Sequence, residues 1–189
     1  RQYAVSETQK YGHVTYFWNG NKSGKFSEEL ETFEEIPSDM VPFDQRPWMK
    51  GAEIADKVIQ AMESGKYDFI RCNFPNGDMV GHTGNMDAAI VAVSAVDLQL
   101  ARILQVAKML GVTVIVTADH GNADQMRVKN KKGGYDIKTA HTLNPVPFIL
   151  YDAEESFVIK EGKWGLANVA STVAALFGLE KPGSWEESM

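Results

Sequence analysis

One stretch decides the fold: Val112-Thr113-Val114-Ile115-Val116-Thr117-Ala118-Asp119-His120-Gly121-Asn122. Its first six residues are all β-branched and hardly alternate with charged groups, which is typical of a strand covered on both faces. Such strands form the sheets of α/β proteins, where ligands gather beyond the carboxyl ends of the strands. The strand predicted over residues 112–117 therefore delivers Asp119 and His120 to that edge of the sheet.

A second strand is followed by the same kind of side chains. Residues 67–74, Tyr-Asp-Phe-Ile-Arg-Cys-Asn-Phe, predict this strand, and Pro-Asn-Gly ends it. Residues 78–84 then favour a glycine-punctuated loop that presents Asp78 and His82. Because both Asp-His pairs follow strands, we expect all four side chains to lie at one edge of the sheet.

The remaining elements alternate between strands and helices, which indicates an α/β fold with a mostly parallel sheet and helices on both faces. Helical periodicity covers residues 49–64 and 85–110, and Gly65 and Gly111 are placed to end these helices. The other predicted elements are strands over residues 14–18 and 146–151, a long loop over 22–47, a polar excursion over 127–138 and a helix over 166–177. We expect residues 1–189 to form a single domain.

Composition restricts the classes of function. The 189 residues include 19 Lys and Arg against 25 Asp and Glu, and the resulting net charge of −6 argues against a nucleic-acid partner. The single cysteine, Cys72, provides neither an internal disulfide nor a cysteine zinc site. No uninterrupted apolar run of membrane-spanning length and no signal peptide stands out, so we expect no membrane partner and a cytoplasmic location. The chain opens at Arg1 rather than Met, which predicts a fragment.

Carboxylate and imidazole groups are common ligands for Mn, Zn, Co and related divalent ions. Two such ions, roughly 3.5 to 4 Å apart, form a clamp for displacement at phosphorus. A lone Asp-His pair in a turn is more often a capping or hydrogen-bonding device. Two such pairs after consecutive strands, together with a further histidine, favour metal binding. The candidate ligands are Asp78, His82, Asp119, His120 and His141.

Two other residues have an ordinary interpretation beside the functional one. His13 has aromatic neighbours and fits a hydrogen-bonded structural role as well as it fits a site. Lys10, considered by itself, fits a solvated lysine. The sequence has no P-loop, no G-x-G-x-x-G fingerprint and no G-x-S-x-G elbow, so nucleotide binding has no motif support.

Four segments, spread in order over nearly the whole chain, carry a resemblance to a known family. They are Ser6-Glu7-Thr8-Gln9-Lys10-Tyr11-Gly12-His13-Val14-Thr15, Asn76-Gly77-Asp78-Met79-Val80-Gly81-His82-Thr83-Gly84, Thr117-Ala118-Asp119-His120-Gly121-Asn122-Ala123-Asp124 and Ala140-His141-Thr142-Leu143-Asn144-Pro145-Val146-Pro147. Together they closely resemble the cofactor-independent phosphoglycerate mutases. The wider group of alkaline-phosphatase-like enzymes is expected to share mainly the metal-ligand segments.

The resemblance implies a role for each candidate residue. Asp78, His82 and His141 would hold one metal ion, Asp119 and His120 would hold a second, and Lys10 would help to neutralise the transferring phosphate. Manganese is the expected metal, with Mg²⁺, Co²⁺ or Zn²⁺ as alternatives. The implied enzyme interconverts 3-phosphoglycerate and 2-phosphoglycerate through a phosphoserine, without 2,3-bisphosphoglycerate, in glycolysis and gluconeogenesis.

The resemblance also implies that parts of the enzyme lie outside this sequence. The family's nucleophilic serine, a further metal-binding aspartate and an inserted substrate-binding domain have no counterpart here, so residues 1–189 would be a partial phosphatase-type domain. We expect this chain alone to be inactive and to self-associate through an uncovered sheet edge, and the complete enzyme to be monomeric. The alternatives are a metal-dependent phosphatase of the alkaline phosphatase superfamily and a non-catalytic metal-binding module.

Overall fold

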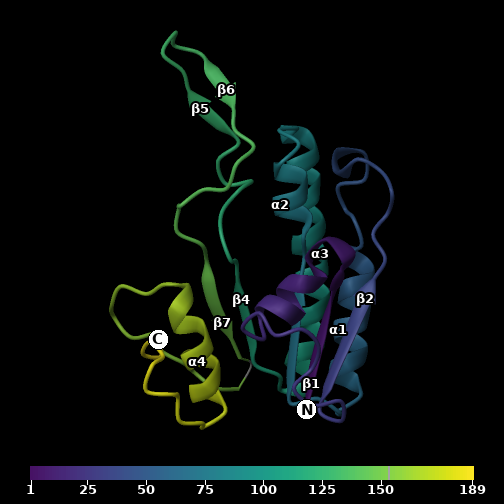
Figure 1. The fold of residues 1–189 in the computed structure, drawn as a ribbon, viewed down its shortest axis with the longest axis vertical. Coiled ribbons are helices and arrows are strands. Elements are labelled where there is room, and N and C mark those ends of the chain that lie inside the picture. Colours follow the sequence, from purple (N-terminus) through teal and green to yellow (C-terminus); the bar gives the residue numbers. More distant parts are fainter. Residues whose placement is uncertain (153) are drawn as a thin grey trace. The chain divides into compact units, whose positions relative to one another are not determined.

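A computed structural model describes residues 1–152 and 154–189, and these two ranges form two compact units. The first unit is built on a parallel sheet in the order β2-β1-β3, formed by β1 (Gln2–Glu7), β2 (Glu31–Ile36) and β3 (Phe69–Asn73). In this sheet Ala4 pairs with Phe33 on one side and with Arg71 on the other. The α/β class is confirmed, and Figure 1 shows the sheet with its helices.

The first strand is β1, and the strand predicted over residues 14–18 is wrong. His13–Phe17 instead forms a wide helical turn, in which the Thr15 hydroxyl donates to the Tyr11 carbonyl. The buried Arg71 side chain donates from Nε to the Val14 carbonyl at 2.7 Å and fixes this turn against the sheet. Aromatic and β-branched residues favour strands only when a partner strand is available, and here tertiary contacts override that preference.

The long loop predicted over residues 22–47 is also wrong in part, because it contains β2. The glutamates of this segment favoured a loop over a strand in the prediction. Charged side chains nevertheless suit a strand at the edge of a sheet. Glu34 accepts a hydrogen bond from the Tyr3 hydroxyl at 2.6 Å and pairs with Lys57 at 2.6 Å. These contacts join the edge strand to β1 and to the neighbouring helix.

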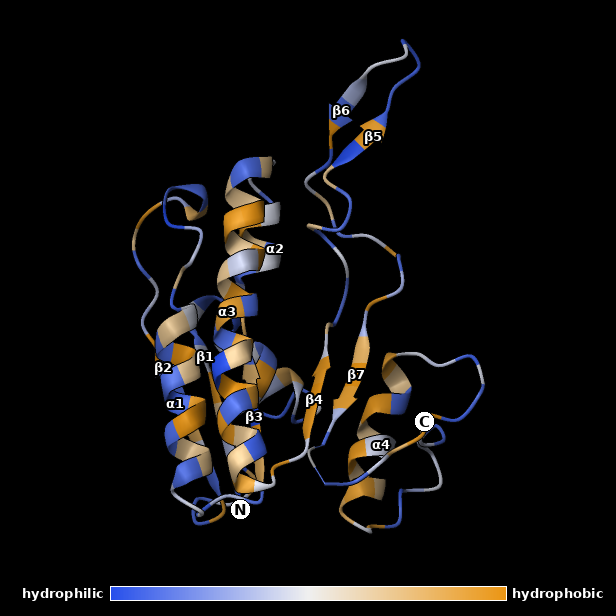
Figure 2. Cartoon of the chain, turned by 180° about the vertical axis from the view of Figure 1, so that it is seen from behind, coloured by the Kyte–Doolittle hydropathy of each residue, from blue (hydrophilic) through white to orange (hydrophobic). Residues whose placement is uncertain are grey.

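Two helices cover one face of the sheet and form the main core with it, as Figures 1 and 2 show from opposite sides. They are α1 (Gly51–Glu63) and α3 (Met86–Leu110), and both confirm predicted helices. The Asn85 side chain caps the start of α3 by accepting from the Ala88 amide. Gly65 and Gly111 follow the two helices with φ of 59° and 64°, the left-handed conformation that glycine tolerates best.

The apolar character of α3 is unusual for a helix so exposed. By length and composition alone it could cross a membrane, and 22% of its most apolar stretch is buried. Core helices of soluble proteins pass the same test. Ile90 and Leu98 are among its exposed apolar side chains, whereas Ile103 and Ala107 pack in the core.

The strand predicted over residues 112–117 is confirmed as β4 (Val114–Thr117), but it lies in a second sheet. Its partner is the antiparallel strand β7 (Phe148–Tyr151), which confirms the strand predicted over residues 146–151. Between them the predicted polar excursion forms a hairpin of β5 (Arg127–Lys129) and β6 (Tyr135–Ile137). Within the described residues, no backbone ladder joins β3 to β4.

The helix predicted over residues 166–177 is confirmed and lies in the second unit. A tight turn over Leu166–Asn168 leads into α4 (Val169–Leu176). The Asn168 side chain donates to the Glu187 carbonyl at 2.9 Å, and the Ser171 hydroxyl donates to the same carbonyl at 3.1 Å. These hydrogen bonds hold the chain end against the start of the helix.

Glu7, the last residue of β1, is a buried carboxyl group whose environment should make the stability of the fold depend on pH. It is 1% exposed and accepts a hydrogen bond from the Lys50 amide at 3.1 Å, just before α1. Burial raises the pKa of the Glu7 carboxyl, although the Lys50 amide opposes this effect.

Because the pKa of Glu7 is higher in the folded state, its contribution to stability is complete at low pH and is lost as pH rises through the folded-state value. We therefore expect Glu7→Gln to gain stability relative to wild type between pH 4 and pH 8, as measured by urea unfolding. Glu29→Gln, at an exposed glutamate, is the control. If the stability of Glu7→Gln relative to wild type stays constant or falls as pH rises, this account is contradicted.

Candidate metal centre

The first group of site residues lies on a short helix that begins directly after β3. Residues 78–84 were expected to form a loop, and this prediction is wrong for residues 78–81, which belong to α2 (Asn76–Gly81), whereas residues 82–84 form a turn. The fully buried Val80 packs this helix against Met49, Met126 and the start of α3. Asp78 and His82 are therefore four residues apart along a helical path, a spacing that brings both side chains to one face.

Three donor atoms converge at the end of this helix. The Oδ1 atom of Asp78 lies 3.1 Å from Nε2 of His82 and 3.1 Å from Nε2 of His141, and the two Nε2 atoms are themselves 3.1 Å apart. We call Asp78, His82 and His141 the first ligand group. One carboxylate oxygen and two imidazole nitrogens at mutually short distances are a donor set that fits a divalent transition-metal ion.

A backbone carbonyl orients one of these imidazoles. Nδ1 of His82 lies 2.6 Å from the Thr139 carbonyl oxygen, and because a carbonyl only accepts, this nitrogen carries the proton. In neutral His82 the Nε2 lone pair is then free and faces the other two donors. A hydrogen bond of this kind from the second nitrogen is typical of metal-binding histidines.

The second pair predicted from the sequence lies beside the first group. The His120 ring stacks on the His141 ring with 3.7 Å between centroids and 18° between planes. Asp119, which follows β4, has its Oδ2 3.5 Å from Nε2 of His120. All five candidate ligands are thus brought to one place, and the stacked rings connect the two groups.

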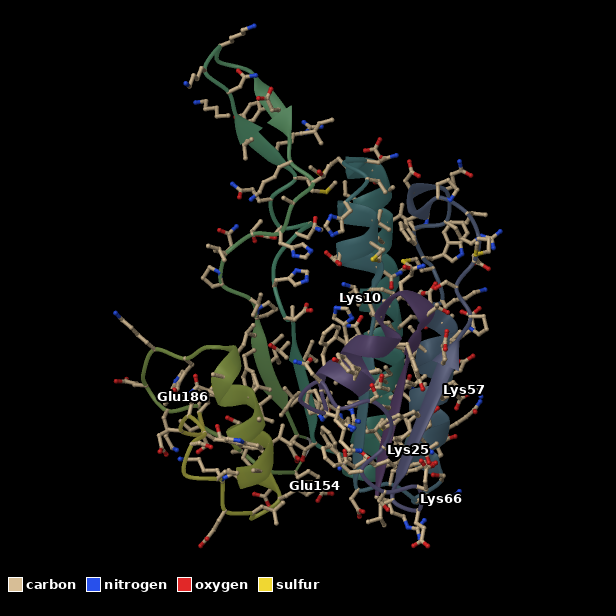
Figure 3. All side chains as sticks on the ribbon, viewed as in Figure 1. Lys10, Lys25, Lys57, Lys66, Glu154 and Glu186 are labelled. Carbon is tan, nitrogen blue, oxygen red and sulfur yellow. The ribbon has the colours of Figure 1, made fainter. Side chains whose placement is uncertain are left out.

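Lys10 contacts the first ligand group directly. Its Nζ lies 2.7 Å from Oδ2 of Asp78, and the Lys10 side chain is 9% exposed. Figure 3 labels Lys10, which ends the short turn that follows β1. Burial raises the pKa of Asp78, but hydrogen bonds from Lys10 and Asn122 outweigh this effect and lower the pKa to about 2. The carboxylate is therefore ionised under all ordinary conditions.

His13, for which the sequence left two interpretations, contacts Phe17 edge to face with ring centroids 5.2 Å apart. Burial and then the charge of Lys10 lower its pKa. His13 is not part of the first ligand group.

The structure adds polar residues that the sequence did not single out. Asn122 donates from Nδ2 to Oδ1 of Asp78 at 2.8 Å. Asp124 accepts from the Thr142 hydroxyl at 3.0 Å and from the Asn144 amide at 2.6 Å, which joins the loop after β4 to the loop that carries His141. Asn122 and Asp124 follow the predicted ligands Asp119 and His120 closely in the sequence, and this was the only signal for them. Their hydrogen-bond partners could not be deduced from one sequence.

Residues 1–181 match the family described as the metalloenzyme superfamily, and the chain belongs to this superfamily. The proteins it resembles in detail are phosphoglycerate mutases. A 2,3-bisphosphoglycerate-independent phosphoglycerate mutase of Trypanosoma brucei brucei is 49% identical over 99% of this chain, and a probable enzyme of that name from Leptospira interrogans is 47% identical over all of it. These matches confirm the resemblance found in the sequence.

A solved structure agrees with these relatives. The crystal structures of Leishmania mexicana phosphoglycerate mutase at low cobalt concentration include a chain that matches the whole of this one with a TM-score of 0.93 and 46% identity. The present chain spans 36% of the length of that structure and 36% of each of the two relatives.

Proposed function

We propose that this chain supplies the metal-binding part of an enzyme that interconverts 3-phosphoglycerate and 2-phosphoglycerate through a phosphoserine. The observation that carries the proposal is the convergence of Asp78 Oδ1, His82 Nε2 and His141 Nε2 at 3.1 Å. The similarity to mutases over the whole chain supports the choice of reaction.

The first ligand group would hold one divalent ion, and Asp119 with His120 would share in holding a second. Bound divalent ions would supply positive charge to a phosphoryl group in transfer. We propose Mn²⁺ as the physiological metal and no requirement for 2,3-bisphosphoglycerate. The whole protein would act in glycolysis and gluconeogenesis in the cytoplasm.

The chain's own residues would prepare the site for a phosphorylated substrate. Lys10 holds Asp78 ionised through its contact with Oδ2, and the Thr139 carbonyl keeps the proton of His82 on Nδ1. The ammonium group of Lys10 also brings a fixed positive charge to the place where an anionic phosphate would bind. Electrostatic positioning of this kind is the main contribution that proteins make to phosphoryl transfer.

Phosphoryl transfer through a phosphoserine needs an acceptor serine, which the resemblance assigns to a segment outside these residues. We therefore expect no mutase turnover from residues 1–189 alone, and turnover when they are joined to the remaining portion of the enzyme. The assay measures 2-phosphoglycerate formed from 3-phosphoglycerate with Mn²⁺ present.

The same assay separates the alternatives. Release of free phosphate without 2-phosphoglycerate would identify a phosphatase, and metal binding without either product would identify a non-catalytic module. Robust mutase turnover by residues 1–189 alone would contradict the division of roles proposed here.

A further inference from the structure

The two ligand-bearing segments follow strands of different sheets. Asp78 and His82 follow β3, whereas Asp119 and His120 follow β4, and no backbone ladder joins β3 to β4 within the described residues. Strand pairing therefore does not set the distance between the segment that carries Asp78 and His82 and the segment that carries Asp119 and His120. That distance depends on contacts between the segments that follow the strands.

Among the residues that the structure describes, one side chain makes direct hydrogen bonds between these segments. Asn122 lies in the loop after β4, is 4% exposed, and donates from Nδ2 to Oδ1 of Asp78 at 2.8 Å and to the Asp78 carbonyl at 3.3 Å. Oδ1 is the same oxygen that faces His82 and His141. Asn122 thus fixes the carboxylate oxygen on which the first ligand group converges.

The packing around Asn122 holds its amide in one place. A Cβ atom at Gly81 would lie 2.4 Å from Oδ1 of Asn122, so only glycine allows α2 to approach this closely. Oδ1 of Asn122 is itself buried without a hydrogen-bond partner among the described residues. An unpaired buried oxygen costs free energy, so the hydrogen bonds that Nδ2 donates to Asp78 are the polar contacts that favour this position of the amide.

We propose that Asn122 is a positioning residue: it connects the loop after β4 to Asp78 and thereby sets the position of Oδ1 in the first ligand group. The proposal rests on the proposed function, since it takes this group to be a metal site. The hydrogen bonds of the Asn122 side chain go to Asp78 and not to an imidazole, so Asn122 would act through Asp78. Residues that hydrogen-bond to metal ligands in this way commonly change metal affinity 10- to 100-fold when they are replaced.

The test compares two buried asparagines in the 189-residue chain. Asn122→Thr replaces the Nδ2 donor with a hydroxyl on a shorter side chain, which withdraws the donor from Asp78 with little change in volume. Asn76→Thr is the matched control, because Asn76 is fully buried, also has an unpaired Oδ1, and donates to the Pro47 carbonyl rather than to a ligand. Mn²⁺ is titrated into each protein by calorimetry, and the visible absorption spectrum of bound Co²⁺ reports the ligand geometry.

We expect Asn122→Thr to raise the Kd for Mn²⁺ roughly 10- to 100-fold and to alter the Co²⁺ spectrum. Asn76→Thr should lower the melting temperature of the metal-free protein but keep the wild-type Kd and spectrum. If Asn122→Thr does not fold, the smaller Asn122→Ser is measured instead. An Asn122 variant that is folded and binds Mn²⁺ within twofold of wild type, with an unchanged spectrum, would overturn this inference alone. Failure of the wild-type chain to bind either metal would overturn the proposed function as well.

Discussion

Replacement of Asp78 by asparagine is expected to lower the free energy of unfolding of the metal-free protein by about 3 kcal/mol, near the lower end of the range for broken buried ion pairs. The side chains of Lys10 and Asp78 are 9% and 14% exposed, and their charged atoms lie 2.7 Å apart. Asparagine has nearly the same shape as aspartate but cannot neutralise the buried ammonium group. Urea unfolding at pH 7 measures the loss.

A double substitution distinguishes the unpaired charge from other causes. In Lys10→Met with Asp78→Asn both charges are removed, so the double variant should be more stable than Asp78→Asn alone. Asp97→Asn, at an exposed aspartate of α3, is the control and should stay within about 0.5 kcal/mol of wild type. A double variant whose loss equals the sum of the two single losses would show that the ion pair is not responsible.

Saturation with Mn²⁺ is expected to stabilise the wild-type chain strongly. A ligand that binds only the folded state at a thousand times its Kd adds about 4 kcal/mol, on the order of 10 °C in melting temperature for a chain of this size. His141→Ala removes one of the three converging donors and should abolish most of this gain. Melting temperatures are measured with Mn²⁺ and again after the metal is removed with a chelator.

His13→Ala is the matched control for this experiment. His13 contacts Phe17 and lies outside the first ligand group, so its loss should leave the stabilisation by Mn²⁺ intact. Equal stabilisation of wild type and His141→Ala would show that the metal binds elsewhere. Loss of the effect in His13→Ala would place that histidine among the metal-binding residues.

The helices and the site segments were predictable because their signals are local. The apolar periodicity of α1 and α3, the Asn85 cap and the glycines after both helices are each properties of a few neighbouring residues. The Asp-His pairs were found in the same way, since each follows a strand of strong β propensity.

The errors arose where distant contacts decide the structure. β1 and β2 contain polar residues that become buried or paired only after the strands meet, as with Glu7 and Glu34. The turn at residues 13–17 depends on Arg71, more than fifty residues away. The role of Asn122 depends on its hydrogen bond to Asp78, and no periodic pattern in the sequence connects these two residues.

The separation of β3 from β4 changes what a bound cation would do for this molecule. Its ligands would come from chain segments attached to two independent ladders, so coordination would act as a cross-link between them. Part of the binding free energy would then offset the cost of ordering the β3 and β4 segments against each other. Metal affinity would therefore depend on how rigidly these two segments are joined in the metal-free protein.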